Sequence, residues 1–423
     1  MEPSSPGLKQ AWLNSAATVL VKGSLAAARV IFLLWAARRI GPDAFGRLAL
    51  CFAIVEILRM VVDFGTENLF LRSLARSDSR ADHAEQLARF GVFRVAAIGA
   101  GLLLYWGAVE VVLRNTTTLI DLLPGALIFT SAGMGYALTY YQSQLRMRRA
   151  ALLLLPVTLT AATVFILMLP KDVTTQLELL IAFELTAVAV FLADMSREGL
   201  FSSATSRQAA HLRTGRDVIF ASLPLAAVAL LATAYTRLDV LVIAPLAGSV
   251  ALGLYSYAYR ISEPFRFLAS AADSTLYSYL SARVDGVGKV ELVRLLLAVL
   301  SYGTLFAIAA VLSGWLLVHF GYEDYRDALP TLGVLGIALF LRCVNGFLTS
   351  LLYARGLYKT VLKIAICNAL LMTATIYPSV AAFGIVGAAA SLLAVEILNC
   401  FLQSRAASAA AGQNVPSFTG TVP

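Results

Sequence analysis

Long apolar runs alternate with short polar segments along the whole chain. A run of about 20 mostly apolar residues is long enough to cross the hydrocarbon core of a bilayer as an α-helix. Six such runs precede one longer polar stretch and six follow it, near residues 12–36, 45–64, 90–113, 119–141, 150–169 and 175–194, and then 217–244, 250–280, 291–318, 328–353, 360–381 and 384–403. The pattern predicts an all-α integral membrane protein of about twelve transmembrane helices.

The longer polar stretch divides the chain into two similar parts. It runs from Ser196 to Arg216, and no apolar periodicity interrupts it. We therefore predict an N-terminal six-helix lobe over 1–194, a cytoplasmic inter-lobe linker over 195–216 and a C-terminal six-helix lobe over 217–403. The remaining residues, 404–423, lack apolar periodicity and are expected to form a disordered cytoplasmic tail.

The composition excludes a soluble protein. Apolar residues make up 59% of the 423-residue chain and charged residues only 14%, whereas soluble domains carry about 25% charged residues. The net charge of +8 does not point to nucleic acid, because the basic residues form short clusters between the apolar runs. That placement is typical of the cytoplasmic loops of membrane proteins.

Lysine and arginine in the loops predict the orientation. With the N-terminus inside, the cytoplasmic loops hold a clear excess of basic residues over the opposite loops. Both termini are therefore expected in the cytoplasm of a bacterial cell, with the protein in the inner membrane. The pair Arg38–Arg39, which follows the first run, is a local exception to this rule.

The two halves of the sequence contain a repeat. Residues 41–76 align without a gap on 248–283, at a constant offset of 207 positions. Matched pairs include two glycines (Gly41 with Gly248, Gly46 with Gly253) and a Glu-x-x-Arg motif (Glu56 and Arg59 with Glu263 and Arg266). Because an even number of spans, six, separates the starts of the two repeats, both repeats begin on the same side of the membrane, and the lobes are expected to be parallel repeats about an axis along the membrane normal.

Ionisable residues inside the predicted spans are the candidates for function. We take fourteen of them as candidates: Lys22, Arg29, Glu56, Arg59, Asp63, Arg94, Glu184, Arg237, Asp239, Arg260, Glu263, Arg266, Arg342 and Glu396. If all faced lipid, they would cost on the order of 40 kcal/mol. They are therefore expected to face the bundle interior or a water-filled cavity.

Lys22 and Arg29 are the strongest candidates for binding an anion. They lie seven residues apart, on one face of the first span, and no acid lies within four residues of either. The alternative is that Arg29 pairs with Asp63 or Glu56 on the second span. Arg94 has no acid as a partner on its own helix, and because it lies only a few residues into its span, its side chain could extend to the cytoplasmic interface.

Other charged residues have partners of opposite sign on their own helix. Glu56, Arg59 and Asp63 lie three or four residues apart, as do Arg260, Glu263 and Arg266. A structural role and a functional role are about equally compatible with this spacing. The acids Glu56, Asp63 and Glu263 are accordingly candidates either for ion coupling or for structural pairing.

No enzyme chemistry is visible in the sequence. There is no phosphate-binding G-x-x-x-x-G-K-[ST] motif, and the three histidines are far apart, without metal-ligand spacing. The four cysteines lie inside apolar runs and do not suggest a disulfide framework or a zinc site. We therefore expect no catalytic residue, cofactor or metal.

Two motifs resemble a known family. Gly41-Pro-Asp-Ala-Phe-Gly46 is followed by Asp63-Phe-Gly65, and the second half contains Arg237-Leu-Asp239 and then Gly253-Leu-Tyr255. These segments are similar to the opening and the second half of the polysaccharide-biosynthesis flippases, within the multidrug/oligosaccharidyl-lipid/polysaccharide exporter superfamily. Ile40 departs mildly from the family pattern, and the resemblance extends over nearly the whole chain.

The resemblance implies a function and a set of residues. It implies translocation of a polyprenyl-pyrophosphate-linked oligosaccharide by alternating access, around a basic cavity to which Lys22, Arg29, Arg59, Arg260 and Arg266 would contribute. A polysaccharide polymerase and glycosyltransferases of the same pathway would be its partners. The alternatives are an ion-coupled drug or metabolite antiporter of the same superfamily and, less favoured, a membrane glycosyltransferase.

Overall fold

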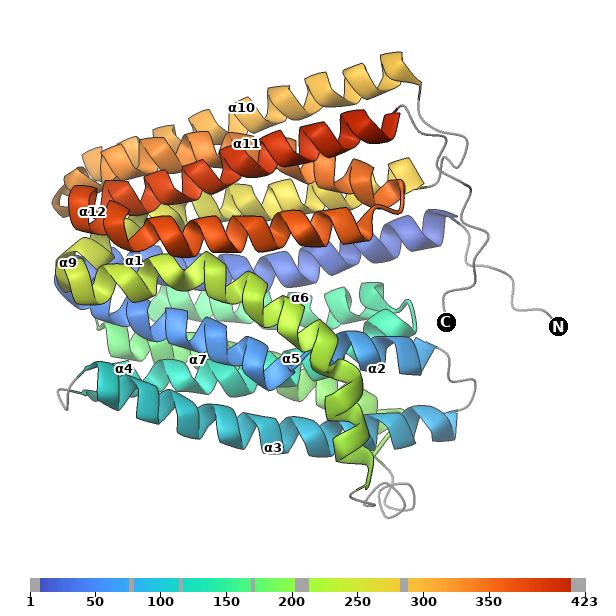
Figure 1. Cartoon of the computed structure of the whole chain (residues 1–423). Helices are drawn as coiled ribbons and strands as arrows, with labels where there is room; N and C mark the ends of the chain where they lie inside the picture. The colour runs from blue at the N-terminus through green and yellow to red at the C-terminus, as the bar shows by residue number, and fades with distance from the viewer. Residues whose placement is uncertain are drawn as a thin grey trace. The chain divides into compact units, whose positions relative to one another are not determined.

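The computed structural model describes residues 8–75, 80–113, 117–168, 172–201, 213–281 and 288–411, and they are almost entirely helical (Figure 1). The helices are α1 (Leu8–Asp63), α2 (Thr66–Ala75), α3 (Arg80–Val112), α4 (Leu119–Leu122), η1 (Leu123–Gly125), α5 (Ala126–Ser143), α6 (Met147–Met168), α7 (Val173–Arg197), α9 (Arg213–Ser281), α10 (Lys289–His319), η2 (Glu323–Ala328), α11 (Leu329–Ala354) and α12 (Tyr358–Ala411).

Three of these helices are pairs of spans joined by a glycine. Gly41 in α1, Gly248 in α9 and Gly384 in α12 have φ angles of 72°, 84° and 57°. Residues with a side chain rarely adopt positive φ, so each glycine allows a sharp break without strain. Figure 1 shows α1, α9 and α12 each turning back as two limbs, and the described residues thus provide twelve helical spans.

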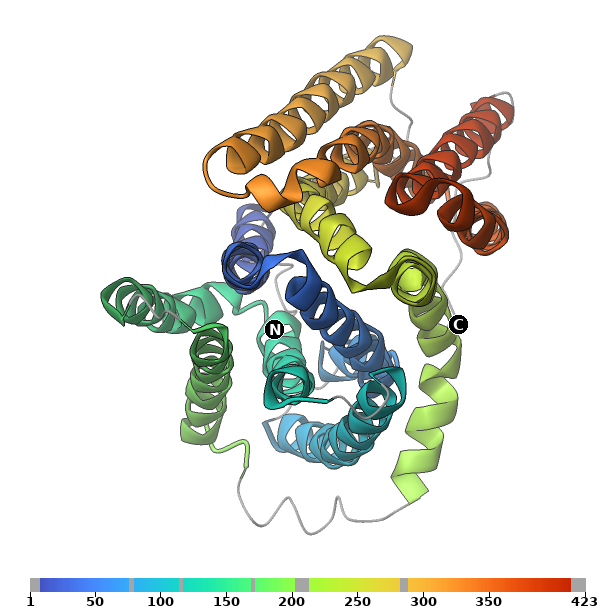
Figure 2. The ribbon, with the colours of Figure 1, turned by 90° about the vertical axis from the view of Figure 1, so that its left-hand side faces the viewer.

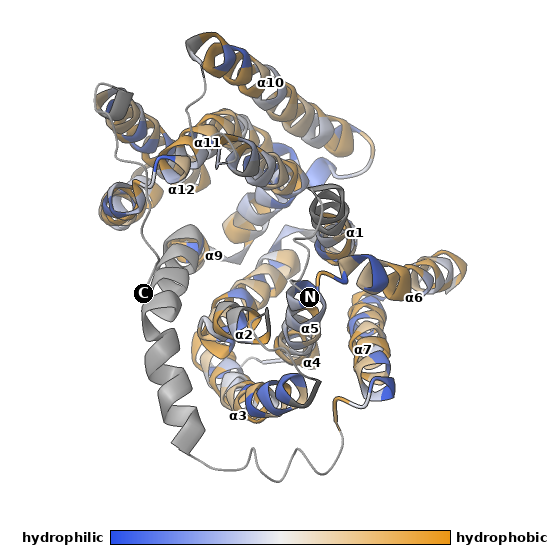
Figure 3. Cartoon of the chain, turned by 90° about the vertical axis from the view of Figure 1, so that its right-hand side faces the viewer, coloured by the Kyte–Doolittle hydropathy of each residue, from blue (hydrophilic) through white to orange (hydrophobic). Residues whose placement is uncertain are grey.

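The exposed apolar surface of several helices requires lipid around the chain. Eight helical stretches among the described residues are long and apolar enough to cross a membrane. Leu152 and Leu167 on α6 remain 68% and 77% exposed, and Leu305 on α10 remains 62% exposed. Figure 3 shows α6 as a largely hydrophobic helix. The prediction of an all-α, multi-pass membrane protein of about twelve spans is confirmed.

The chain forms two compact units, and their boundaries lie inside helices. Unit 1 comprises 1–32 and 50–234, and unit 2 comprises 33–49 and 235–423. Figure 2 shows most helices of each unit nearly end-on. Helix α12 runs through Ala411, so the predicted disorder is wrong for 404–411, while 412–423 and residues 202–212 of the predicted linker lie outside the described residues.

Unit 1 has a core of aromatic and aliphatic side chains between α2, α3, α5 and α7. The rings of Phe70 and Phe90 stack with centroids 4.3 Å apart, and Tyr141 packs against Phe191. The Tyr136 hydroxyl in this core is paired, since it donates to the carbonyl of Leu87 at 2.9 Å. This core holds α1, α5 and α7 as a rigid support for the polar residues described below.

Unit 2 contains a reciprocal contact between the two glycine-containing repeat motifs. A Cβ atom on Gly46 would overlap with the backbone carbonyl of Ser249, and one on Gly253 would overlap with that of Pro42. Gly253 and Ser249 are the equivalents of Gly46 and Pro42 at the offset of 207. The same close backbone approach therefore occurs twice, as expected for two related turns packed about a pseudo-twofold axis.

Candidate functional site

Arg29 is held by an ion pair between helices of unit 1. Its Nε and Nη2 donate to Oε1 and Oε2 of Glu184 on α7, at 2.6 and 2.8 Å. Nη2 also donates to Oγ of Ser131 on α5 at 2.8 Å. The Thr130 hydroxyl donates to the same carboxylate at 2.5 Å, and the Glu184 side chain is only 3% exposed. Such a two-pronged guanidinium–carboxylate contact fixes both side chains geometrically.

The structure therefore identifies a partner for Arg29 that the sequence did not suggest. The sequence-based alternative placed Asp63 or Glu56 opposite Arg29, whereas the acid that forms this bidentate contact is Glu184, 155 residues away along the chain. The idea that Arg29 is structurally paired thus has a physical basis, and its bidentate partner is an acid on the sixth span.

Arg59 and Lys22 belong to the same charged region. Arg59 interacts electrostatically with Arg29, Glu56, Glu67 and Glu184. Lys22, which is exposed on the surface of the unit, interacts with Glu67. The structure thus brings three of the predicted binding residues, Lys22, Arg29 and Arg59, into one region of unit 1. Together with Arg94 and the acids Glu56, Asp63, Glu67 and Glu184, we call them the unit 1 cluster.

Arg94 is buried inside unit 1, between acids of α1 and α2. Its side chain is 2% exposed, and Nη2 contacts Asp63 at 3.2 Å and Glu67 at 3.1 Å. Its guanidinium also lies over the ring of Phe90, 4.7 Å from the centroid. Two acids and an aromatic face stabilise the charge inside the unit, so the side chain does not need to reach water.

Asp63 has a local structural role as well. Its carboxylate accepts the backbone N–H of Glu67 at 3.3 Å, at the start of α2. The preceding turn places Phe64 and Gly65 at positive φ, which separates α1 from α2. The Asp63-Phe-Gly65 motif therefore forms a helix break and aims Glu67 and Asp63 together at Arg94.

The unit 1 cluster is balanced in formal charge. Its four basic side chains face four carboxylates, which act as internal counter-ions. A polyanionic ligand is recognised by arginine through charge-assisted hydrogen bonds. To bind such a ligand, an arginine of the cluster must leave a carboxylate partner such as Glu184 and pair with the ligand instead. Alternatively, the ligand first contacts Lys22, which is more accessible.

Unit 2 contains the other predicted basic residues. Arg260 pairs with Glu263 on its own helix at 2.7 Å, and its side chain is 7% exposed. The guanidinium groups of Arg266 and Arg237 lie 4.6 and 4.8 Å from the ring centroid of Tyr259. Aromatic faces stabilise buried cations in this way.

A buried acid accompanies this arginine group. Asp239 is 2% exposed and accepts the hydroxyl of Tyr255 at 2.5 Å and the N–H of Val240 at 2.8 Å. It also interacts electrostatically with Arg237 and Arg266. The Arg237-Leu-Asp239 motif thus supplies one cation and one anion to the same polar group.

Sequence reasoning missed two acids. Glu67 follows the second span, and it contacts Arg94 and packs against Gly135, where a Cβ would overlap with its carboxylate. Asp273 lies inside the eighth predicted span but was not counted among the fourteen ionisable residues; it is taken up below. Asp273 could have been found from the sequence, because it is an acid inside a predicted span. The contact between Glu67 and Arg94 could not, because it depends on the turn of the chain at Gly65.

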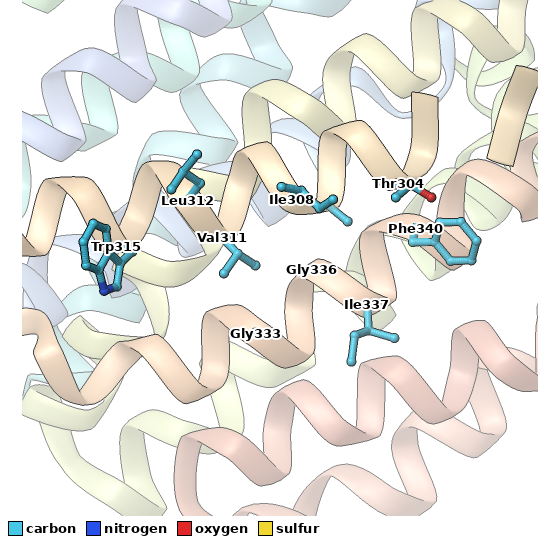
Figure 4. A pocket seen from close by; sticks show the side chains of 10 residues that line it. Thr304, Ile308, Val311, Leu312, Trp315, Gly333, Gly336, Ile337 and Phe340 are labelled. Atoms are coloured by element: carbon cyan, nitrogen blue, oxygen red, sulfur yellow. The ribbon is translucent and has the colours of Figure 1, made fainter. Parts of the chain in front are cut away.

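An apolar pocket in unit 2 contains none of these residues. It measures about 600 Å³ and lies between α10 and α11 in unit 2 (Figure 4). Its lining consists of Thr304, Ala307, Ile308, Val311, Leu312, Trp315, Gly333, Gly336, Ile337 and Phe340. Such a surface accommodates hydrocarbon and offers no charge for an ionic ligand. Among the described residues, no group of three His, Cys, Asp or Glu side chains is arranged to hold a metal.

Comparisons with known proteins agree on the family and the fold. Residues 11–283 match the family model described as polysaccharide biosynthesis protein. Among solved structures, the lipid II flippase MurJ in an inward closed conformation has a TM-score of 0.65 at 14% identity, covering 94% of this chain and 87% of that one.

Multidrug-type transporters share the fold as well. The eukaryotic MATE transporter AtDTX14 has a TM-score of 0.56 at 12% identity, covering 95% of both chains. A MOP superfamily transporter from Pyrococcus furiosus also has a TM-score of 0.56 at 12% identity, covering 95% of this chain and 97% of that one. None of the curated proteins matches the sequence. At these identities the structural likeness shows the fold alone, and the proteins that share it are described as a flippase and as transporters.

Proposed function

Because the chain belongs to the polysaccharide biosynthesis protein family, we propose that it is a flippase for a polyprenyl-pyrophosphate-linked oligosaccharide. It would move this lipid-linked glycan across the bacterial inner membrane for the synthesis of a surface polysaccharide such as O-antigen or exopolysaccharide. Both termini would lie in the cytoplasm. A polymerase and the glycosyltransferases of the same pathway would act before and after it.

One observation supports this proposal most directly: Lys22, Arg29 and Arg59 gather in one region of unit 1. A pyrophosphate carries several charged oxygens, and each charge-assisted hydrogen bond to it contributes about 1.5–3 kcal/mol. Glu184, which holds Arg29 in the structure, would act as the counter-ion while the ligand is absent. Arg260 and Arg266 of unit 2 would contribute in the same way.

A drug or metabolite cation antiporter remains the second candidate. The unit 1 cluster contains as many acids as bases, four of each, whereas the sequence showed Lys22 and Arg29 without nearby acids. The structure therefore favours the antiporter more than the sequence did. A cationic ligand would use Glu56, Glu67 or Glu184 rather than the arginines. The two candidates therefore differ in which side chains must keep their charge.

The proposal is tested by transport in vesicles that contain the purified full-length protein. A fluorescent polyprenyl-pyrophosphate oligosaccharide is placed in both leaflets, and the fraction protected from an impermeant quencher is followed over time. We expect protein-dependent translocation that the double variant Lys22→Ala, Arg59→Ala slows at least about tenfold, since two ligand contacts are lost.

Arg89→Ala is the matched control, because Arg89 pairs with Glu85 on the surface of α3 and lies outside the cluster. It should translocate at the rate of the parent protein. Unchanged transport in the double variant would contradict the proposed binding residues. Absence of glycan transport, together with efflux of a cationic dye by the same vesicles, would refute the flippase and support the antiporter.

A further inference from the structure

Unit 2 contains a second polar cluster, on the helices that surround its apolar core. We call it the Asp273 cluster: Asp273 on α9, Tyr302 on α10, Arg342 and Asn345 on α11 and Glu396 on α12. Arg342 Nη1 lies 3.6 Å from Glu396 Oε1, and Asn345 Nδ2 donates to Glu396 Oε2 at 2.6 Å. Asp273 interacts electrostatically with Arg342 and with Tyr302.

Three buried oxygen atoms of this cluster have no hydrogen-bond partner among the described residues. They are Oδ1 of Asp273, Oη of Tyr302 and Oδ1 of Asn345. The Asn345 residue is only 3% exposed. Buried polar atoms are normally paired, and a carboxylate oxygen can be paired only by a donor, so the unpaired Oδ1 of Asp273 indicates a place where a donor is absent. A proton on the Asp273 carboxyl would supply such a donor.

The surroundings of Asp273 leave its carboxylate poorly compensated. The carboxyl group lies directly against Gly346, where a Cβ atom would overlap with it. The neighbouring core residues Cys343, Phe347 and Ala269 are almost fully buried and offer no charge. Burial without a paired countercharge favours the neutral form of a carboxyl group.

The charge count of the cluster points to one proton. Arg342 is the cation that interacts with Asp273 and Glu396, and it already contacts Glu396. Two carboxylates and one guanidinium give a net charge of −1, which a single proton neutralises. A metal cation fits less well, because it needs several oxygen ligands and would lie close to the guanidinium. The Arg342 side chain is 42% exposed, so the cluster reaches the surface of the unit at this residue.

We propose that the Asp273 cluster is a proton-binding site, in which the Asp273 carboxylate takes up one proton from water and becomes a carboxylic acid. The Arg342–Glu396 pair sets its proton affinity. No other bond is made or broken, and the proton leaves by the reverse reaction. The proposal concerns proton binding by unit 2, and it stands whether or not the transported substrate is a lipid-linked glycan.

Infrared difference spectroscopy on the full-length protein tests this directly. The protein is reconstituted in phosphatidylcholine–phosphatidylglycerol vesicles without substrate and titrated from about pH 9 to about pH 5. We expect a carboxylic-acid carbonyl band that grows on acidification with a midpoint inside this range and is missing in Asp273→Asn. Asp172→Asn, which removes an exposed acid outside the cluster, should keep the band.

Two variants that retain Asp273 keep the test decisive even if Asp273→Asn does not fold. In Glu396→Gln, Arg342 becomes available to Asp273, so the midpoint should move to lower pH by about one unit or more, a tenfold loss of proton affinity. In Arg342→Met the midpoint should move to higher pH. Midpoints that do not move, a band that survives Asp273→Asn, or loss of the band on adding sodium at constant pH would each overturn the proposal.

Discussion

The pairing of Arg29 with Glu184 leads to a quantitative prediction about the stability of unit 1. Replacing Arg29 by Met keeps the length of the side chain but removes the charge. Glu184 would then remain a carboxylate at 3% exposure, with only the Thr130 hydroxyl as its donor. Breaking a buried ion pair costs about 3–5 kcal/mol. Because the Arg29 side chain is still 21% exposed, we expect a loss of about 3 kcal/mol.

A double-mutant cycle separates this structural role from ligand binding. Glu184→Gln keeps the shape of the acid and removes its charge, so Arg29→Met combined with Glu184→Gln leaves no buried unpaired charge. We expect the double variant to recover much of the lost stability, with a coupling energy of about 1–3 kcal/mol. The free energy of unfolding is measured by titrating mixed micelles with a denaturing detergent and following tryptophan fluorescence.

A matched control for Arg29→Met is the same substitution in an ion pair that is more exposed. Arg89→Met breaks an exposed pair with Glu85 on α3, which should cost less than about 1 kcal/mol. If Arg29→Met is as stable as the control and the cycle shows no coupling, the ion pair contributes nothing to stability. Loss of glycan transport in that stable variant would then assign Arg29 to ligand binding alone.

Three further predictions concern topology, packing and pH. A cysteine at position 323 should react with an impermeant reagent in intact cells, because the loop around 323 is expected outside. A cysteine at position 207 should not react, because that loop is expected in the cytoplasm. Gly46→Ala should destabilise unit 2 by about 1–3 kcal/mol in the same micelle titration, because its methyl group would overlap with a backbone carbonyl. The carboxylate of Asp172 caps the start of α7 by accepting the backbone N–H of Thr175, and this hydrogen bond lowers the pKa of the exposed Asp172 carboxyl. The cap should therefore stabilise α7 fully above the ordinary pKa of aspartate, and this stabilisation should be lost as the pH falls through the lowered pKa.

Each of these has its own control. Labelling at position 207 without labelling at 323 would contradict the predicted orientation and indicate the opposite one. Gly99→Ala meets no atom within 4 Å and should be neutral, so equal effects at Gly46 and Gly99 would contradict the steric argument. Asp172→Ala should cost about 1 kcal/mol at neutral pH and less in acid. A pH-independent cost would show that the carboxylate charge is not what caps the helix.

Apolar periodicity was enough to predict the helices and most of their ends. The pattern also divided neighbouring spans that only a single turn separates. The sequence repeat aligns Gly41 with Gly248, and the helix breaks at both residues. These features are local, because the length of a span and the conformational freedom of glycine are properties of short segments.

The partners of the charged residues could not be predicted in the same way. Arg29 and Glu184 are far apart in the sequence, and only the packing of α1 against α5 and α7 brings them together. Arg94 appeared unpaired because its acids lie beyond a helix break. Spacing along one helix reveals pairs on that helix, whereas pairs between helices depend on how each helix is rotated about its own axis.

The reciprocal contact of Gly46 and Gly253 has the form of an isologous interface, in which the same patch is used by both partners. Interfaces of that kind are normally found between identical subunits of a homodimer. An ancestral chain of one repeat would have met its second copy through this turn, at a strength set by protein concentration. Fusing the two copies into one polypeptide replaces that concentration with a fixed local one. Within one polypeptide the two turns can differ in sequence, except at the two glycines of the crossing point, where a side chain would overlap with the other turn's backbone.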